Sequence, residues 1–219
     1  MGVLESALQQ GVADLGLALT RAQKQQLLDY LGLMQKWGKV YNLTAVRDPQ
    51  EMLTHHLLDS LAIIAPLQRH LSGKGRLAGA RLLDVGSGAG LPGVVIAVCC
   101  PGIGVVCVDA VAKKAAFIQQ VAASLMLPNL RGLHARVESL ADGYDVVVSR
   151  AFASLADFTC WSATALRADG VWLAMKGKNP QDELAALPRE IEMFHVEPLV
   201  VPGLDAQRCL VWMRQRPPV

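Results

Sequence analysis

Apolar residues recur at helical spacing through the first third of the chain. This periodicity predicts three helices, over residues 3–19, 21–38 and 49–65. The start of the second helix is marked by Thr20 and Gln23, which have the spacing of a capping box directly before the apolar stripe. The third helix is expected to begin at Pro49, after the N-cap residue Asp48, and to end near Pro66.

Beyond a segment over 67–80 that is rich in Gly, Ser, Lys and Arg and reads as a linker, strand-like and helix-like patterns alternate. The predicted strands cover residues 81–85, 104–109, 131–135, 144–149 and 170–175. The predicted helices cover residues 92–100, 112–126, 153–167 and 181–193. Two final strands, over 194–201 and 208–214, flank a Pro-Gly turn and are expected to form an antiparallel hairpin. The alternation predicts an α/β fold with a seven-stranded, mostly parallel sheet covered by helices.

Length and composition fit this organisation. We expect the 219 residues to form an N-terminal helical extension over 1–70 and one α/β domain over 71–219. The formal net charge of +2 gives no overall field that would demand a nucleic acid, so any RNA must be held by local basic patches. Five cysteines without C-x-x-C spacing, mostly within apolar runs, are typical of cytosolic core thiols. We expect no signal peptide, no membrane span, a cytoplasmic location and a monomer.

The first predicted strand runs into a glycine-rich loop. Three of its glycines, Gly86, Gly88 and Gly90, allow tight turns and close approach to a ligand. Their Gly-x-Gly-x-Gly spacing differs from the dinucleotide fingerprint, in which the third glycine comes one residue later. With Asp84 before the loop and Asp109 at the end of the next strand, the pattern is typical of S-adenosylmethionine sites, where Asp109 would accept hydrogen bonds from two ribose hydroxyls. An acid at this position also serves NAD, so an NAD site and a loop that only turns the chain remain the alternatives.

The end of the fourth strand is informative through what it lacks. The residues Ser149–Phe152 do not form the Asn/Asp-Pro-Pro-Tyr/Phe tetrapeptide that methyltransferases of exocyclic amines carry at this position. Methylation at C5 of a pyrimidine needs a cysteine nucleophile at a strand end. Cys160 instead falls within a predicted helix, and Cys99 and Cys100 end another. Covalent catalysis by cysteine is therefore not expected.

Four stretches of the chain carry family-specific motifs, and they are Trp37–Thr44, His56–Ser60, Asp84–Gly93 and Ser149–Ala153. Together they resemble the RsmG family, also called GidB, and the resemblance runs from about residue 20 to the C-terminus. The glycine loop is common to many methyltransferases, whereas Leu-Pro-Gly after it, Ser-Arg-Ala-Phe-Ala and the N-terminal motifs together are specific. The resemblance implies a Rossmann-like class I methyltransferase fold. It also implies transfer of a methyl group from S-adenosylmethionine to N7 of a guanine, conventionally guanine 527, in the 16S rRNA of the small ribosomal subunit.

The resemblance also assigns roles position by position. Gly86 and Leu91 match residues that contact the cofactor along the first loop, Val137 and Glu138 match the pair that flanks the adenine, and Arg150 matches an arginine that lines the cofactor pocket. The family often has Asp-Ser at the end of the second strand, where this chain has Asp109 and an alanine. Together with the loop pattern, the candidate cofactor residues are Asp84, Gly86, Gly88, Gly90, Leu91, Asp109, Val137, Glu138 and Arg150.

Methylation at guanine N7 requires little from acid–base groups. Because N7 carries a lone pair and no proton, attack on the sulfonium methyl needs no general base, and we assign no catalytic residue. A cationic Arg150 is unfavourable beside a purine that becomes positive, so we assign it to the cofactor carboxylate or to an RNA phosphate. Candidate contacts to RNA phosphates are Lys113, Lys114, Lys176 and Lys178, for which solvated surface charge is the alternative.

Several aromatic and histidine positions are expected to be structural. We expect Trp37 and Tyr41 to pack in the core rather than to stack on a base. The adjacent His55 and His56 would diverge by about 100° on a helix, so no metal site is predicted, and His56 and Asp59 are expected to pack within the helix. The competing functions are a methyltransferase of small molecules, an NAD oxidoreductase and a non-catalytic RNA-binding subunit.

Overall fold

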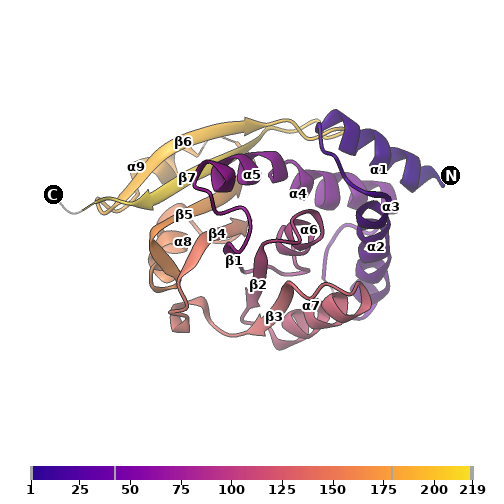
Figure 1. Ribbon diagram of the computed structural model, residues 1–219, viewed down its shortest axis with the longest axis horizontal. Coiled ribbons are helices and arrows are strands. Elements are labelled where there is room, and N and C mark those ends of the chain that lie inside the picture. The colour runs from indigo at the N-terminus through magenta and orange to yellow at the C-terminus, as the bar shows by residue number, and fades with distance from the viewer. Residues whose placement is uncertain (1, 42, 179, 218–219) are drawn as a thin grey trace.

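Within residues 2–41, 43–178 and 180–217, which the computed structural model describes, the strands form one seven-stranded sheet in the order β3-β2-β1-β4-β5-β7-β6 (Figure 1). The strands are β1 (Arg81–Val85), β2 (Gly104–Asp109), β3 (Leu130–His134), β4 (Tyr144–Arg150), β5 (Leu166–Lys176), β6 (Ile191–Leu199) and β7 (Arg208–Gln215). Neighbours among β1 to β5 pair in parallel, and β7 runs antiparallel to both β5 and β6. The predicted mostly parallel sheet with a terminal antiparallel hairpin is confirmed.

The central strands are buried on both faces because their apolar residues form unbroken runs. Val146, Val147 and Val148 of β4 are fully buried, as are Leu82 and Leu83 of β1. Successive side chains of a strand point to opposite faces, so these runs require an apolar layer on each side of the sheet.

Helices supply both layers. One face of the sheet packs with α6 (Gly93–Cys99), α7 (Ala112–Ser124) and the N-terminal helices around one large apolar cluster. The other face packs against α8 (Leu155–Trp161), where Leu155 and Phe158 join a second cluster, with the short α9 (Gln181–Ala185) at its margin.

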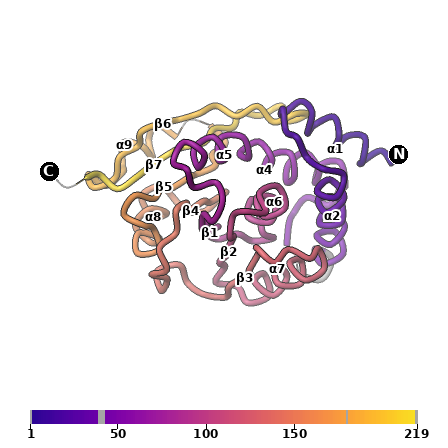
Figure 2. The backbone as a smooth tube through the Cα atoms, viewed as in Figure 1, coloured from indigo at the N-terminus to yellow at the C-terminus, as the bar shows by residue number. Residues whose placement is uncertain are grey.

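The N-terminal helices are α1 (Val3–Asp14), α2 (Arg21–Tyr41), α3 (Pro49–Met52), α4 (Asp59–Leu61) and α5 (Ile64–Gly73), and a π-helical turn, Leu53–Leu58, joins α3 to α4. Both predicted caps are formed: the amide of Gln23 donates to Thr20 Oγ1 at 3.2 Å, and Asp48 accepts from the amides of the next turn. Figure 2 shows α2 beside α6 and α7. The ring centroids of Trp37 in α2 and Phe117 in α7 lie 5.9 Å apart. Core packing of Trp37 is confirmed, whereas the side chain of Tyr41 lies outside the described residues.

Pro66 does not end a helix as predicted. The third predicted helix pauses at residues 62–63, and α5 then begins at Ile64 and continues to Gly73. Pro66 therefore occupies the first turn of α5, where a missing N–H group costs no hydrogen bond. Leu67 and Leu71 bury the apolar side of this helix, so much of the predicted linker over 67–80 is helical.

Three other predicted helices are too long. The helix predicted over 3–19 ends at Asp14, because the chain turns back and the Leu17 amide donates to the carbonyl of Val12 at 3.0 Å. The helix predicted over 153–167 ends at Trp161, and a 3₁₀ turn leads into β5, which starts early because Leu166 pairs beside Tyr144. The helix predicted over 181–193 ends at Ala185, since the following residues cross a proline and enter β6.

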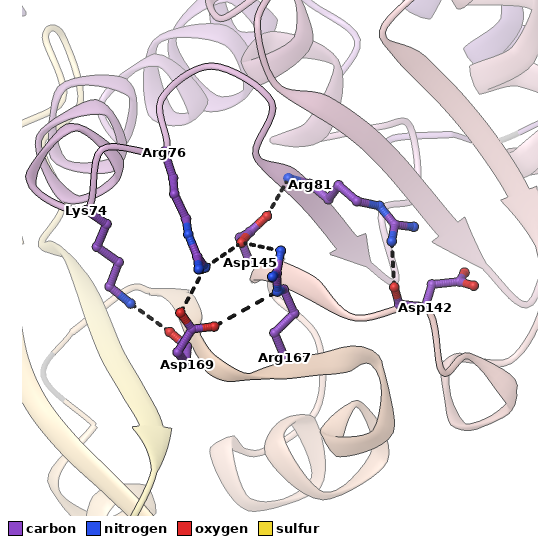
Figure 3. Close-up of polar contacts among 7 residues, drawn as sticks. All are labelled: Lys74, Arg76, Arg81, Asp142, Asp145, Arg167 and Asp169. Carbon is purple, nitrogen blue, oxygen red and sulfur yellow. Dashed lines mark hydrogen bonds and ion pairs between the residues drawn. The ribbon is translucent and has the colours of Figure 1, made fainter.

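A polar cluster joins the segment before β1 to the amino ends of β4 and β5 (Figure 3). Its centre is the buried carboxylate of Asp145, which accepts hydrogen bonds from Arg76 Nη1 at 3.0 Å, Arg167 Nη1 at 3.1 Å and the Arg81 amide at 2.8 Å. Arg76 also pairs with Asp169 at 2.9 Å. This cluster fixes the entry to the sheet at the edge opposite the glycine loop.

The apolar cluster that contains Leu82 and Val146 of the sheet also contains Leu8, Leu31 and other residues of the N-terminal helices. The division of the chain at residue 70 therefore stays a prediction about organisation along the sequence. No helix within the described ranges combines the length and the apolar character that crossing a bilayer requires.

Candidate active site

The glycine loop leaves the carboxyl end of β1 and lies against β2 and the end of β4. The Gly86 amide donates to the carbonyl of Val108 at 3.0 Å, and Gly86 has a φ of +64°. A Cβ at this position would lie 2.4 Å from Cδ2 of Phe152. Glycine is therefore required here both by the backbone conformation and by the close approach of the Phe152 ring. On the inner side, the Tyr30 hydroxyl of α2 donates to the carbonyl of Ala89 at 2.7 Å and anchors the loop.

Asp84 lies beneath the loop rather than in a cavity. Its side chain is fully buried, and Oδ2 accepts a hydrogen bond from the Gly93 amide at the start of α6 at 2.8 Å. Burial raises the pKa of this carboxyl to about 7. Oδ1 is buried and has no hydrogen-bond partner in the described part of the chain. Asp84 can therefore support the loop from within the core.

Asp109 closes the other side of the loop. Its Oδ2 accepts from the Gly88 amide at 3.0 Å, and its Oδ1 accepts from the Val111 amide at 2.9 Å. Each carboxylate oxygen has a further lone pair, so the side chain can still accept from a ligand. Lys114, a predicted RNA contact, lies beside this carboxylate, with Nζ 3.7 Å from Oδ2.

A cavity of about 190 Å³ lies over this edge of the sheet, and we call it the loop cavity. It is lined by Val85, Gly86, Val108, Asp109, Ala110, Ala135, Arg136, Val137, Glu138, Phe152 and Trp161. Four predicted cofactor residues, Gly86, Asp109, Val137 and Glu138, thus line this cavity. Gly90 and the buried Leu91 belong to the same loop but are not among the lining residues. None of the residues predicted from the sequence belongs to the aromatic wall, in which Phe152 and Trp161 pack edge to face with ring centroids 5.7 Å apart. No local signal marks Trp161, because its position in a helix gives no sign that it reaches the strand ends.

A second cavity, of about 340 Å³, lies at the carboxyl ends of β4 and β5, and we call it the arginine cavity. It is lined by His55, His56, Asp59, Arg150, Ala151, Met175, Lys176, Gly177 and Arg208. Arg150 lines this cavity and is not among the residues that line the loop cavity, so its contact with the cofactor stays a prediction. Consecutive residues line the two cavities: Arg150 and Ala151 line the arginine cavity, and Phe152 lines the loop cavity. Ala151 has a φ of +56°.

The segment before α4 forms one wall of the arginine cavity. His56 is buried, its Nε2 lies 2.7 Å from Thr44 Oγ1, and burial together with the nearby Arg150 lowers its pKa. His56 packs within the helical segment, as predicted. Asp59 is buried as well, but its carboxylate also binds Arg150 Nη1 at 3.0 Å and Arg208 Nε at 2.8 Å. Among the described residues, no group of three His, Cys, Asp or Glu side chains has an arrangement that could hold a metal ion.

Comparison with known proteins gives these cavities a chemical context. Residues 23–211 match the model of a family described as rRNA small subunit methyltransferase G. A Polaromonas sp. (strain JS666 / ATCC BAA-500) protein of that name is 67% identical over 210 residues, with 96% of this chain and 93% of the relative covered. The homologue of the same name from Acidovorax ebreus (strain TPSY) is 66% identical over 215 residues, with 96% and 95% covered. The chain belongs to the rRNA small subunit methyltransferase G family.

Solved structures confirm the class of fold. A Burkholderia thailandensis 1,6-didemethyltoxoflavin-N1-methyltransferase aligns with a TM-score of 0.57 at 17% identity, covering 85% of this chain and 89% of that chain. TrmN from Thermus thermophilus aligns with a TM-score of 0.55 at 18% identity, covering 75% of this chain and 53% of that chain. Members of the rRNA small subunit methyltransferase G family are methyltransferases, and S-adenosylmethionine is the methyl donor. The NAD alternative is thereby set aside.

The loop cavity suits this cofactor on structural grounds. Gly86 lines the cavity without a Cβ, Asp109 has unused acceptor capacity, and Phe152 and Trp161 supply an apolar wall. Gly88 is not among the lining residues, but its amide binds Asp109. The four lysines predicted to contact RNA differ in their surroundings. Lys176 is bound by Glu183 at 2.7 Å, and Lys114 lies beside Asp109, so both are committed to ion pairs. The exposed ones are Lys113 and Lys178.

Proposed function

We propose that the chain transfers the methyl group of S-adenosylmethionine to N7 of a guanine in 16S rRNA, guanine 527 in the conventional numbering. The observation that carries this proposal is that consecutive residues at the end of β4 line both cavities, Arg150 and Ala151 the arginine cavity and Phe152 the loop cavity. A cofactor in the loop cavity and a nucleotide in the arginine cavity would meet at this segment. The carboxyl ends of β1 and β4 lie at the same edge, where open α/β sheets bind their ligands.

Within the loop cavity, we assign the cofactor contacts from the geometry of the wall. Asp109 would accept hydrogen bonds from the ribose hydroxyls, and Val137 and Glu138 would flank the adenine. Gly86 and Gly88 would let the loop backbone approach the rest of the cofactor. Asp84, Gly90 and Leu91 would act indirectly, by holding the loop in this conformation.

The reaction would be one displacement. The N7 lone pair forms the new bond to the methyl carbon as the carbon–sulfur bond breaks and its electron pair stays on sulfur. Positive charge passes from sulfur to the purine, and no proton moves. The protein would contribute alignment and exclusion of water, which can supply a large part of a rate enhancement. Because no proton moves, the reaction needs no free base, and His56 Nε2 already lies 2.7 Å from Thr44 Oγ1.

The substrate assignment can be tested by incubating the protein with S-adenosylmethionine and small ribosomal subunits, or naked 16S rRNA, from cells that lack the modification. We expect one methyl group per rRNA, located by mass spectrometry of nuclease fragments and by the chemical lability of N7-methylguanine. Methylation at another base, or none on either substrate, would overturn the proposal. An rRNA substrate also implies a cytoplasmic site of action.

The cofactor assignment has a separate test. We expect Asp109→Ala to weaken binding of S-adenosylhomocysteine by at least tenfold in calorimetry, because two hydrogen bonds to the ribose are lost. The exposed Lys113→Ala is the matched control and should bind S-adenosylhomocysteine as the unmodified protein does. Equal affinities of the two variants would remove Asp109 from the cofactor site.

A further inference from the structure

Asp59 is held between two arginines that come from distant parts of the chain. Its Oδ2 binds Arg150 Nη1 at 3.0 Å, and its Oδ1 binds Arg208 Nε at 2.8 Å. Arg150 ends β4, Arg208 begins β7, and Asp59 belongs to α4. The N-terminal helical segment, which also supplies His55 and His56 to the cavity wall, thus contributes a carboxylate that pairs with arginines of two strands.

The charges of this group do not cancel. The side chain of Asp59 is 4% exposed, and those of Arg150 and Arg208 are 20% and 24% exposed. Two guanidinium groups share one carboxylate, which leaves one positive charge in excess. The other cation of the cavity, Lys176, is matched by Glu183 at 2.7 Å. The excess positive charge of the arginine cavity therefore resides on the arginine pair.

Both guanidinium groups also keep unused donors. Arg150 bonds to Asp59 and to the carbonyl of His55 through Nη1 alone. Arg208 uses Nε for Asp59 and Nη1 for the carbonyl of Gln207. In the described ranges, no protein acceptor meets Nε and Nη2 of Arg150 or Nη2 of Arg208. Planar guanidinium donors held in place suit the oxygens of a phosphate, which can accept two parallel hydrogen bonds.

We propose that Asp59 is a positioning residue that fixes Arg150 and Arg208 so that their remaining donors bind a backbone phosphate of the RNA next to the target nucleotide. The inference rests on the proposed methylation of rRNA. Without the carboxylate, two guanidinium groups that now share it would repel each other and move apart, which would remove the paired geometry while keeping both charges. An ordered anion site would become a diffuse basic patch.

The test compares Asp59→Asn with the unmodified protein in steady-state methylation of the small subunit rRNA substrate. We expect the KM for RNA to rise at least tenfold, with kcat changed less than threefold and affinity for S-adenosylhomocysteine within twofold. Arg208→Lys should raise the KM for RNA by at least threefold, because a lysine keeps the charge but not the planar set of donors.

Asp145→Asn is the matched control. Asp145 is also a buried carboxylate shared by two arginines, Arg76 and Arg167 (Figure 3). It lies at the amino end of β4, whereas the arginine cavity lies at the carboxyl end of that strand. Its loss should lower the melting temperature by an amount similar to that for Asp59→Asn, and it should leave the KM for RNA unchanged. An equal rise in KM for both variants would show that Asp59 acts only through stability.

Two further outcomes would overturn the inference. If Asp59→Asn and Arg208→Lys both bind RNA normally, the arginine pair holds no phosphate. If they lose S-adenosylhomocysteine affinity more than tenfold and keep RNA affinity, the anion is the cofactor carboxylate. Should Asp59→Asn not fold, Arg208→Lys alone decides. Failure of the proposed function would look different, because the unmodified protein would then methylate no rRNA. The RNA affinities of the unmodified protein and of the variants can still be compared in that case by fluorescence anisotropy.

Discussion

Oδ2 of Asp84 accepts a hydrogen bond from the backbone amide of Gly93 at 2.8 Å, so the carboxylate near the end of β1 holds the first residue of α6. The two residues flank the glycine loop in the chain, so this hydrogen bond joins its two ends. A side chain larger than hydrogen at residue 93 has no room, since a Cβ would lie 2.3 Å from Cys107 Sγ and 2.8 Å from Asp84 Oδ2. The loop conformation thus depends on a contact between two residues that do not line the loop cavity.

Gly93→Ala should therefore destabilise the protein although it adds only one methyl group. We expect the free energy of unfolding to fall by about 1–3 kcal/mol, as for other overpacked cores, when it is measured by urea denaturation. Gly102→Ala is the control, because the nearest atom to its Cβ would be 3.6 Å away. Similar losses for both variants would contradict the crowding seen at Gly93.

Protonation of Asp84 should make stability depend on pH. The pKa of the carboxyl is about 7 in the folded protein and 3.8 in its ordinary environment, because burial penalises the charged form. The folded state therefore binds this proton more tightly than the unfolded state does. The stabilisation that protonated Asp84 contributes is fully present below pH 3.8 and is lost as the pH rises through about 7.

Asp84→Asn removes this titration and keeps an oxygen that can accept from the Gly93 amide. Relative to the variant, the unmodified protein should lose more than about 1 kcal/mol of unfolding free energy between pH 5 and pH 8. Urea denaturation of both proteins at the two pH values measures the difference, and other titrating groups cancel in it. Parallel pH profiles would show that Asp84 is not the group responsible.

Gly86→Ala and Gly88→Ala separate backbone strain from crowding. Both glycines have positive φ, +64° and +58°, so an alanine is strained at either position. Only the Cβ at residue 86 would meet Phe152, at 2.4 Å, while the Cβ at residue 88 would meet nothing within 4 Å. In the ligand-free protein, Gly86→Ala should lower stability by about 1–2 kcal/mol more than Gly88→Ala. Equal melting temperatures would mean that Phe152 moves aside without cost.

Trp161 should report on the loop cavity by its fluorescence. Its side chain lines the cavity, and the residue is 39% exposed, so a bound cofactor would change the surroundings of the indole. Addition of S-adenosylhomocysteine should alter tryptophan emission in the unmodified protein, and Trp161→Phe should abolish most of that change. Trp212→Phe, which replaces a buried tryptophan of β7 that does not line the cavity, should retain it. Retention of the full signal in Trp161→Phe would place the cofactor elsewhere.

How far the sequence predicted the fold depended on how local each signal was. The first two strands were predicted with their observed bounds, because short apolar runs between turn residues are buried on both faces in almost any α/β arrangement. Pro66 was misread, because a proline suits the first turn of a new helix as well as the end of an old one, and only the burial of Leu67 and Leu71 decides between these.

Residues close together in the chain specify the order of the strands and helices, the glycine loop and the acidic residue Asp109 beside it, so the sequence predicts all three. The contacts of the arginine cavity, in contrast, arise only from tertiary packing. Asp59 meets Arg150 across 91 residues and Arg208 across 149 residues, a meeting that no local pattern records. Tertiary packing also decided that Asp84 supports the loop and that Trp161 lines the cavity. Side chains at such distances meet only when the sheet and helices have packed, because burial, and not spacing along the chain, brings them together.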